Sequence, residues 1–120
     1  MVRNEATQAL APADIETFKA FMPELFAGSV HVDIQAFSPL IDSSDVNPEC
    51  WVRIARMVYD HYDDYDGFVV LHGTDTMSYS ASALSFMLQN LSKPVVFTGS
   101  QLPVGVLRSD AKENLLTAIE

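Results

Sequence analysis

Basic residues and cysteine are scarce in this 120-residue sequence, and both shortages narrow what the protein can bind and where it can work. Seven lysines and arginines stand against 16 aspartates and glutamates, which gives a formal net charge of -9. Nucleic acids and anionic membrane surfaces are bound through clustered basic side chains, so we expect neither as a partner. The single Cys50 cannot close a disulfide within the chain, and residues 1–5 contain no apolar signal core, so we expect a cytoplasmic protein.

Long apolar runs, metal-ligand spacings and nucleotide-binding motifs are also missing. No apolar run approaches the roughly 20 residues of a membrane-spanning helix. Cys50 and the three histidines lack the spacing of a metal site, and the acidic turn at residues 60–66 lacks the glycine and glutamate of a calcium-binding loop. Neither the phosphate-binding loop nor the dinucleotide-binding fingerprint occurs. We therefore expect no metal and no cofactor.

Apolar residues are abundant enough for one packed domain, since 48% of the chain is hydrophobic and 19% is charged. Helical spacing of the apolar residues predicts four helices: residues 12–25 with an end or kink at Pro23, a helix that begins at Asn47-Pro48, residues 76–90, and residues 110–120. The third is apolar around most of its girth, so we expect it to be buried, for example at a subunit interface. The last has no stop signal, so we expect the chain to be cut within that helix.

Three strands are predicted between the helices. Residues 30–37 alternate between apolar and polar side chains, which predicts a half-exposed strand near a sheet edge. The uninterrupted apolar run 68–71 predicts a strand buried on both faces, and residues 95–97 predict another short strand. Strands that alternate with helices indicate right-handed βα units, so the fold class we expect is α/β, with a mostly parallel sheet and flanking helices.

Polar loops follow all three predicted strands, at residues 42–45, 73–76 and 99–101. In open α/β sheets, ligands bind beyond the carboxyl ends of the strands, so we expect these loops to converge on one site. His72, at the start of the second loop, is expected to end its strand, and a supporting role beside the site is the alternative.

Thr74 and Asp75 are the residues of these loops that are best suited to chemistry. Gly73 permits a tight turn, after which both residues stand at the N-terminus of a helix, where free N–H groups favour an anion. The Thr74 hydroxyl can act as a nucleophile or position a water, but it needs a base. Asp75 can hold a cationic amine or orient a lysine that deprotonates Thr74. The residues alone also allow a purely structural role, in which both cap the helix.

The stretch from Tyr65 to Met77, Tyr-Asp-Gly-Phe-Val-Val-Leu-His-Gly-Thr-Asp-Thr-Met, resembles the second signature of the bacterial-type asparaginase family. Three further segments are similar to the cytoplasmic type I branch, in order and at family spacing: Asp42–Asp45, Thr98–Pro103 and Leu107–Asp110. The resemblance runs from about Pro39 to Glu120. It implies the asparaginase fold, a homodimer or homotetramer in the full-length protein, and the small-molecule substrate L-asparagine.

The resemblance also implies roles for individual residues. Thr74 and Asp75 would belong to a Thr-Asp-Lys catalytic group, with Asp75 also binding the substrate α-amino group. The substrate pocket would be formed by Asp42, Ser43, Ser44, Gly73, Thr74, Asp75 and Ser100. Ser43 would bind the α-carboxylate, and Ser100 would present its backbone near the side-chain amide. In this family a threonine attacks that amide, ammonia leaves, and water hydrolyses the acyl-enzyme to aspartate.

Two parts of the family pattern do not occur in this sequence. The Thr-Gly-Gly-Thr signature of the first strand is missing, and neither Lys93 nor Lys112 stands where the family lysine is required. We therefore expect residues 1–120 to be a partial asparaginase N-terminal α/β domain, without the first strand and the C-terminal domain, and to be inactive alone. Ser44 also replaces a glutamine that helps to bind the substrate amine in the extracellular type II branch.

Two alternatives remain open. The asparaginase-like subunit of a tRNA-dependent amidotransferase shares the His-Gly-Thr-Asp-Thr turn, although residues 102–105 look more like the free-standing enzymes. The chain could also be a non-enzymatic remnant that at most binds a partner. The main hypothesis is hydrolysis of L-asparagine to L-aspartate and ammonia by the full-length parent.

Overall fold

The computed structural model describes residues 2–3, 10–11, 16, 19–20, 22–37, 41, 43–102 and 107–120, with the backbone alone at 2–3, 10–11, 25–26 and 43. Its elements in chain order are β1 (Val2–Arg3), β2 (Leu10–Ala11), α2 (Glu24–Ala27), the short 3-10 helix η1 (Ser43–Asp45), α3 (Pro48–His61), β3 (Phe68–Leu71), α4 (Met77–Met87), β4 (Val95–Thr98) and α5 (Ala111–Ile119). Within this described part, no helix combines the length and the apolar character that crossing a bilayer requires.

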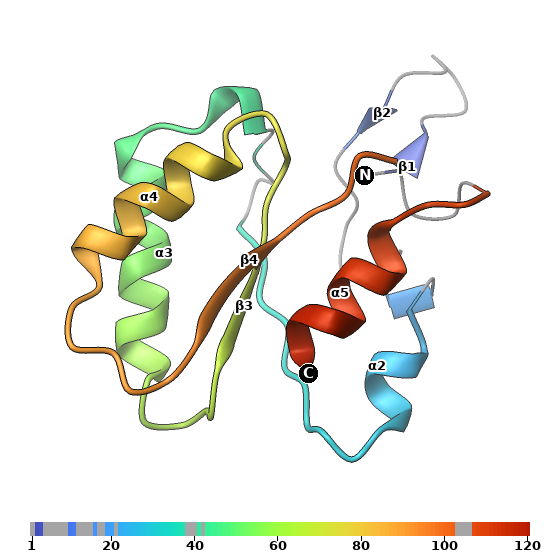
Figure 1. The fold of residues 1–120 in the computed structure, drawn as a ribbon, viewed down its shortest axis with the longest axis horizontal. Coiled ribbons are helices and arrows are strands. Elements are labelled where there is room, and N and C mark those ends of the chain that lie inside the picture. The colour runs from blue at the N-terminus through green and yellow to red at the C-terminus, as the bar shows by residue number, and fades with distance from the viewer. Residues whose placement is uncertain are drawn as a thin grey trace.

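A βαβ unit lies at the centre of the molecule (Figure 1). Strands β3 and β4 pair in parallel, with Phe68 opposite Val95 and Leu71 opposite Thr98, and α4 connects them. This arrangement confirms the α/β class and the parallel pairing that the two apolar runs predict. Because the strands are parallel and in this register, the loops that follow them leave from the same edge of the sheet.

Helices lie on both sides of the strand pair (Figure 1). Helices α3 and α4 pack against each other on one side, and α5 packs against β4 on the other. Helix α3 begins as predicted, because the Asn47 side chain accepts a hydrogen bond from the Cys50 N–H at 3.2 Å and proline occupies the first turn. Its buried residues are Cys50, Ile54 and Val58.

A second small core ties α5 to the N-terminal part of the chain. Met22 and Leu115 are buried against each other, and Val69 of β3 packs against the pair. On the surface, the Lys112 ammonium donates to the Glu24 carboxylate at 2.6 Å, which joins α5 to α2. The predicted helix at residues 12–25 is helical at residues 16, 19 and 20, Pro23 caps the separate α2, and most of its remaining residues lie outside the described ones.

The antiparallel pairing of β1 with β2 is absent from the sequence-based prediction. Two elements that we expect to be buried are partly exposed in the single chain. Helix α4 buries only Ser80 and Leu84, while Tyr79 is 68% exposed and Phe86 is 80% exposed. Strand β3 is half-buried up to Val70, and Leu71 is exposed. An apolar composition predicts that a surface needs cover, but it does not say which neighbour provides the cover.

The predicted strand at residues 30–37 is wrong, since residues 31–37 form no strand. The alternation holds only in the middle of this stretch, where Val32 and Ile34 are half-buried between exposed residues, whereas Val30 and Ala36 are exposed. Alternation specifies the two faces of an extended chain, whereas a strand also needs a pairing partner.

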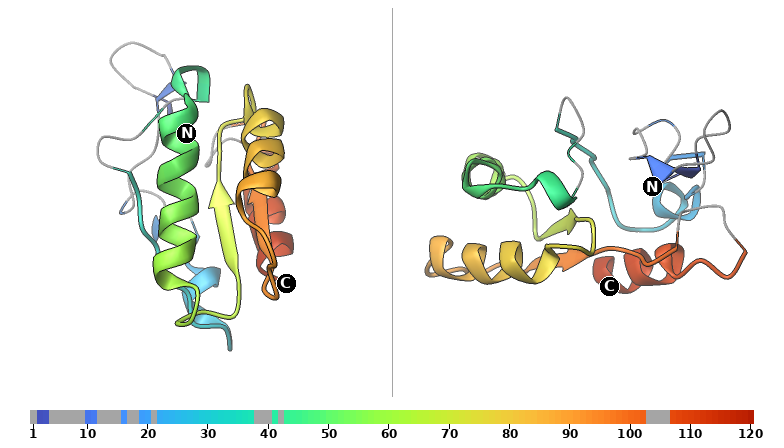
Figure 2. Two further views of the ribbon diagram at one scale, coloured as in Figure 1. Left: turned by 90° about the vertical axis from the view of Figure 1, so that its left-hand side faces the viewer. Right: turned by 90° about the horizontal axis from the view of Figure 1, so that it is seen from above.

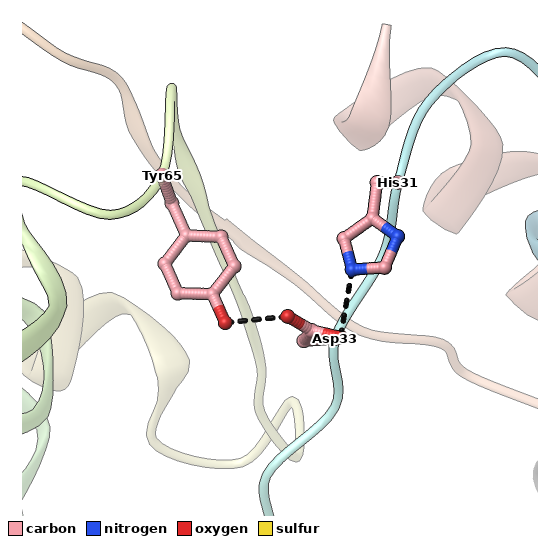
Figure 3. A network of polar contacts seen from close by, with 3 residues as sticks. All are labelled: His31, Asp33 and Tyr65. Carbon is pink, nitrogen blue, oxygen red and sulfur yellow. Dashed lines mark hydrogen bonds and ion pairs between the residues drawn. The ribbon is translucent and has the colours of Figure 1, made fainter.

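Side-chain contacts hold this extended segment instead (Figure 3). The Tyr65 hydroxyl donates to the Asp33 carboxylate at 2.5 Å, and His31 Nε2 lies 3.1 Å from the other carboxylate oxygen. The Tyr65 hydrogen bond lowers the pKa of Asp33, and the Asp33 carboxylate raises the pKa of Tyr65. The segment is therefore attached to the turn that leads into β3.

Candidate active site

The two loops that follow β3 and β4 lie in direct contact at the carboxyl ends of their strands. The His72 N–H donates to the Thr98 carbonyl at 2.9 Å, which extends the strand pairing by one residue. A Cβ atom on Gly99 would overlap the His72 carbonyl oxygen and would lie 3.6 Å from the Thr74 Cγ2 atom. Glycine is therefore required at residue 99 by the close approach of the other loop. The structure thus brings together two of the three loops that the sequence places at one site.

The third loop is described in part. Residues 43–45 form η1, and the Ser44 side chain is exposed. Figures 1 and 2 place η1 at the end of the molecule to which β3 leads. Asp42 and the side chain of Ser43 lie outside the described residues, so the pocket roles implied for these residues stay predictions.

Thr74 and Asp75 lie in the turn between β3 and α4. Thr74 is half-buried, and Asp75 is exposed. Helix α4 begins at Met77 with Thr76 as its N-cap residue, so the capping position falls after both Thr74 and Asp75. This position is unfavourable to the alternative in which the two residues only cap the helix. It leaves a hydroxyl and a carboxylate on one turn, beside the Gly99 loop.

A threonine nucleophile needs a base, and both lysines weighed from the sequence are engaged elsewhere. Lys112 pairs with Glu24. Lys93 precedes β4, at the opposite end of the strands, where its ammonium donates to the Tyr62 carbonyl at 2.5 Å and lies 4.8 Å from the Tyr62 ring centre. Neither lysine is placed to deprotonate Thr74, as expected from the family pattern.

A chain of side-chain hydrogen bonds connects helices α3 and α4 to the turn that carries Thr74 and Asp75. The Trp51 Nε1–H of α3 donates to the Ser80 hydroxyl oxygen of α4 at 2.8 Å. The same oxygen lies 2.8 Å from His72 Nε2, and His72 Nδ1 lies 2.6 Å from the Gly73 carbonyl oxygen. Ser80 is fully buried. The helical pattern predicts only that Trp51 belongs to the apolar face of its helix, and no sequence signal predicts a role for Ser80.

The Gly99 loop is held by two side chains of the segment that opens α5. The Asp110 carboxylate accepts hydrogen bonds from the backbone N–H groups of Gln101, at 3.1 and 3.2 Å, and of Leu102, at 3.1 Å. These bonds, that of Gln101 first, lower the pKa of Asp110. The Asn114 amide donates to the Gly99 carbonyl at 2.9 Å.

The Ser100 hydroxyl is also occupied within this loop. It donates to the Leu102 carbonyl at 2.8 Å, and the Ser109 hydroxyl donates to the same oxygen at 3.1 Å. A substrate group at this loop would therefore meet the Ser100 backbone more readily than its hydroxyl. The Ser109 oxygen also accepts from the Ala111 N–H at 3.2 Å, one residue before the N-cap position of α5 at Asp110.

Comparisons with known proteins cover the whole chain, although the sequence motifs begin only near Pro39. Residues 1–120 match the family described as Asparaginase, N-terminal. L-asparaginase 1 of Escherichia coli K12 is 52% identical over 120 residues, which are 99% of this chain and 36% of that protein. The crystal structure of L-asparaginase I from Vibrio cholerae is similar with a TM-score of 0.80 and 51% identity, over 89% of this chain and 34% of that one.

A more distant similarity involves one subunit of the glutamyl-tRNA(Gln) amidotransferase of Thermoplasma acidophilum. It is 40% identical over 102 residues, which are 81% of this chain and 25% of that protein. The chain therefore spans about a third or less of the length of each of these relatives.

Proposed function

Because this chain belongs to the asparaginase family, we propose that the protein that carries it hydrolyses L-asparagine to L-aspartate and ammonia. The observation that supports the proposal most directly is the contact between the Thr74 turn and the Gly99 loop. The Thr74 and Asp75 side chains and the backbone of the Gly99 loop thus lie at one edge of a parallel sheet, where ligands bind in α/β folds.

In the proposed reaction, Thr74 and Asp75 form part of a Thr-Asp-Lys group whose lysine comes from outside residues 1–120. Asp75, exposed at the turn, binds the substrate α-amino group, and Ser43 binds the α-carboxylate. Asp42, Ser44 and Gly73 complete the pocket.

A threonine oxygen adds to the side-chain carbonyl carbon, and its proton passes through the base to the departing ammonia. The C–N bond breaks and leaves a threonine ester. Water then adds to the ester carbonyl, which releases the aspartate carboxyl and restores the hydroxyl. Residues 1–120 hold one half of a two-threonine site in this scheme, as part of an N-terminal domain, and should release no ammonia alone.

The decisive experiment measures ammonia release from L-asparagine by the full-length protein and its Thr74→Ala variant. We expect kcat/KM to fall by roughly 10³-fold or more, because the loss of one member of a catalytic group removes most of its effect. Thr74→Ser keeps the hydroxyl and should retain part of the activity. Wild-type rates in Thr74→Ala would contradict the assignment.

Amide hydrolysis within a tRNA-dependent amidotransferase is the second candidate function, supported by the similarity to the amidotransferase of Thermoplasma acidophilum. The two functions differ in what the protein needs in order to act. A free-standing enzyme should release ammonia without any partner, whereas a component of an amidotransferase should require its partner protein and tRNA. Assay of the purified full-length protein alone separates them.

We also propose a cytoplasmic location and a homodimer or homotetramer. The single cysteine and the similarity to type I enzymes support the location. Tyr59 of α3 and Tyr79 and Phe86 of α4 have exposed side chains. They support the homo-oligomer, since an interface between subunits would remove this apolar surface from water. Light scattering of the full-length protein measures the oligomeric state, and a monomer would contradict it.

A further inference from the structure

The hydrogen bonds among Trp51, Ser80 and His72 have a single consistent direction. The indole N–H of Trp51 can only donate, so the Ser80 oxygen accepts from it. The Gly73 carbonyl can only accept, so His72 Nδ1 carries the proton of that bond. A neutral imidazole has one N–H, so in that form its Nε2 accepts a hydrogen bond from the Ser80 hydroxyl.

This direction gives each of the three donors, the indole N–H, the Ser80 O–H and the Nδ1–H, one acceptor in the chain. Ser80 is fully buried, so water could not accept a hydrogen bond from its hydroxyl if no protein acceptor were present. An Nε2–H imidazole could donate to the second lone pair of the Ser80 oxygen, but it would leave the Ser80 O–H without an acceptor in this chain and the Gly73 carbonyl without this donor. The buried end of the chain therefore selects the Nδ1–H tautomer of His72.

At the other end of this chain of hydrogen bonds, His72 donates to the carbonyl of the peptide that joins Gly73 to Thr74. The Gly73 carbonyl and the Thr74 N–H belong to one planar peptide unit, so a hydrogen bond that fixes the carbonyl also fixes the orientation of the Thr74 backbone. The other side of the turn is fixed by the contact between the His72 carbonyl and Gly99. Glycine at residue 73 has no side chain to restrict this peptide, so an external hydrogen bond has more to contribute there.

We propose that Trp51, Ser80 and His72 are positioning residues for amide hydrolysis, which act by holding the Gly73–Thr74 peptide in the orientation that the reaction requires. The inference rests on the proposed function. The three residues do not contact the substrate in this role. They come from α3, α4 and the β3 loop, so the packing of two helices determines the geometry of a catalytic turn.

The test compares the full-length wild type with Ser80→Ala, His72→Phe and His72→Asn. Ser80→Ala removes the hydroxyl that links Trp51 to His72, with little change in volume. It should lower kcat by about 10- to 100-fold while KM changes little, as is typical of small misplacements of a reacting group. His72→Phe should lose at least as much. His72→Asn can still donate to the Gly73 carbonyl from its amide, so it should recover part of the loss. Ser85→Ala, an exposed serine of the same helix, is the matched control and should behave like the wild type.

A second readout does not depend on activity. Solid-state NMR of ¹⁵N-histidine-labelled protein reports which ring nitrogen of His72 carries the proton, and the His72→Asn spectrum identifies the signal. We expect the Nδ1–H tautomer in the wild type and a shift toward Nε2–H in Ser80→Ala. An Nε2–H tautomer in the wild type, or wild-type kcat in folded Ser80→Ala, would overturn the positioning role while leaving the asparaginase proposal intact. An inactive wild type would overturn both proposals.

Discussion

The loop after β3 and the loop after β4 lie against each other, yet they are held by different kinds of interaction. The first is held by side-chain hydrogen bonds that run from Trp51 through buried Ser80 to His72. The second is held by the Asp110 carboxylate, which accepts from two backbone N–H groups near the surface. Neutral buried bonds depend on shape and on complete pairing, whereas the bonds of a carboxylate are stronger individually but respond to pH.

The difference suggests a division of tasks between the loops. The turn that carries the proposed nucleophile is fixed from the helical core, through side chains that are distant in sequence. The loop that would face the substrate amide is fixed locally, by a carboxylate only eight or nine residues away. We expect the first loop to be sensitive to packing and the second to be sensitive to charge.

Among the changes that test how the two loops are held, Gly99→Ala should have the largest effect, because it breaks the contact between the loops. The new methyl group would overlap the His72 carbonyl, so one backbone must move. We expect a loss of stability of about 1–3 kcal/mol and a fall in kcat/KM of about 100-fold, measured by thermal unfolding and by ammonia release. Gly28→Ala is the control, since nothing lies within 4 Å of a Cβ at that residue. Equal behaviour of the two variants would show that the loops do not need their close approach.

A smaller effect should follow from Asp110→Asn, which alters only the second loop. The amide keeps an oxygen acceptor but loses the charge that strengthens the bonds to Gln101 and Leu102. We expect faster hydrogen exchange at these two amides and a fall of about tenfold in kcat/KM. Glu113→Gln removes the same charge from an exposed neighbouring residue and should change neither measurement. Faster exchange at the His72 amide as well would contradict the expectation that the first loop does not depend on this charge.

The smallest effect should be the pH response of the same loop. The bonds from Gln101 and Leu102 lower the pKa of Asp110 below its ordinary value of 3.8. A lowered pKa means that the carboxylate stabilises the loop above pH values near 3.8 and that this contribution is lost as the pH falls through the lowered pKa. The amide resonances of Gln101 and Leu102 should therefore shift with a midpoint below 3.8. Asp110→Asn should abolish the transition, and a midpoint above the ordinary value would show that the bonds are absent in solution.

The parts of the fold that could be predicted are those with a local cause. Asn47 and Pro48 start a helix through contacts within a few residues, and the apolar runs before His72 and Gly99 become the paired strands. The extended segment at 31–37 and the exposed face of α4 could not be predicted, because their state depends on which neighbour covers them.

The candidate site divides in the same way. Thr74, Asp75 and Gly99 follow strands, so the rule for α/β sheets locates them from their order along the chain. The partners of Ser80 could not be found in this manner, because Trp51 lies 29 residues away and has the spacing of an apolar helix residue. Asp110 has the position of a helix start, although its carboxylate binds the loop before it.

The hydrogen bond between Tyr65 and Asp33 limits the conformational freedom of the third loop, residues 42–45, because it fixes a point of the chain shortly before that loop (Figure 3). Asp33 is thereby anchored beside the turn that enters β3, only ten residues before η1 begins at Ser43. A shorter tether confines those residues to a smaller volume around the strand ends, which lowers the entropy they lose on closing over a ligand. The effective concentration of the Ser43–Asp45 segment at the strand ends is then set, in part, by one tyrosine hydroxyl.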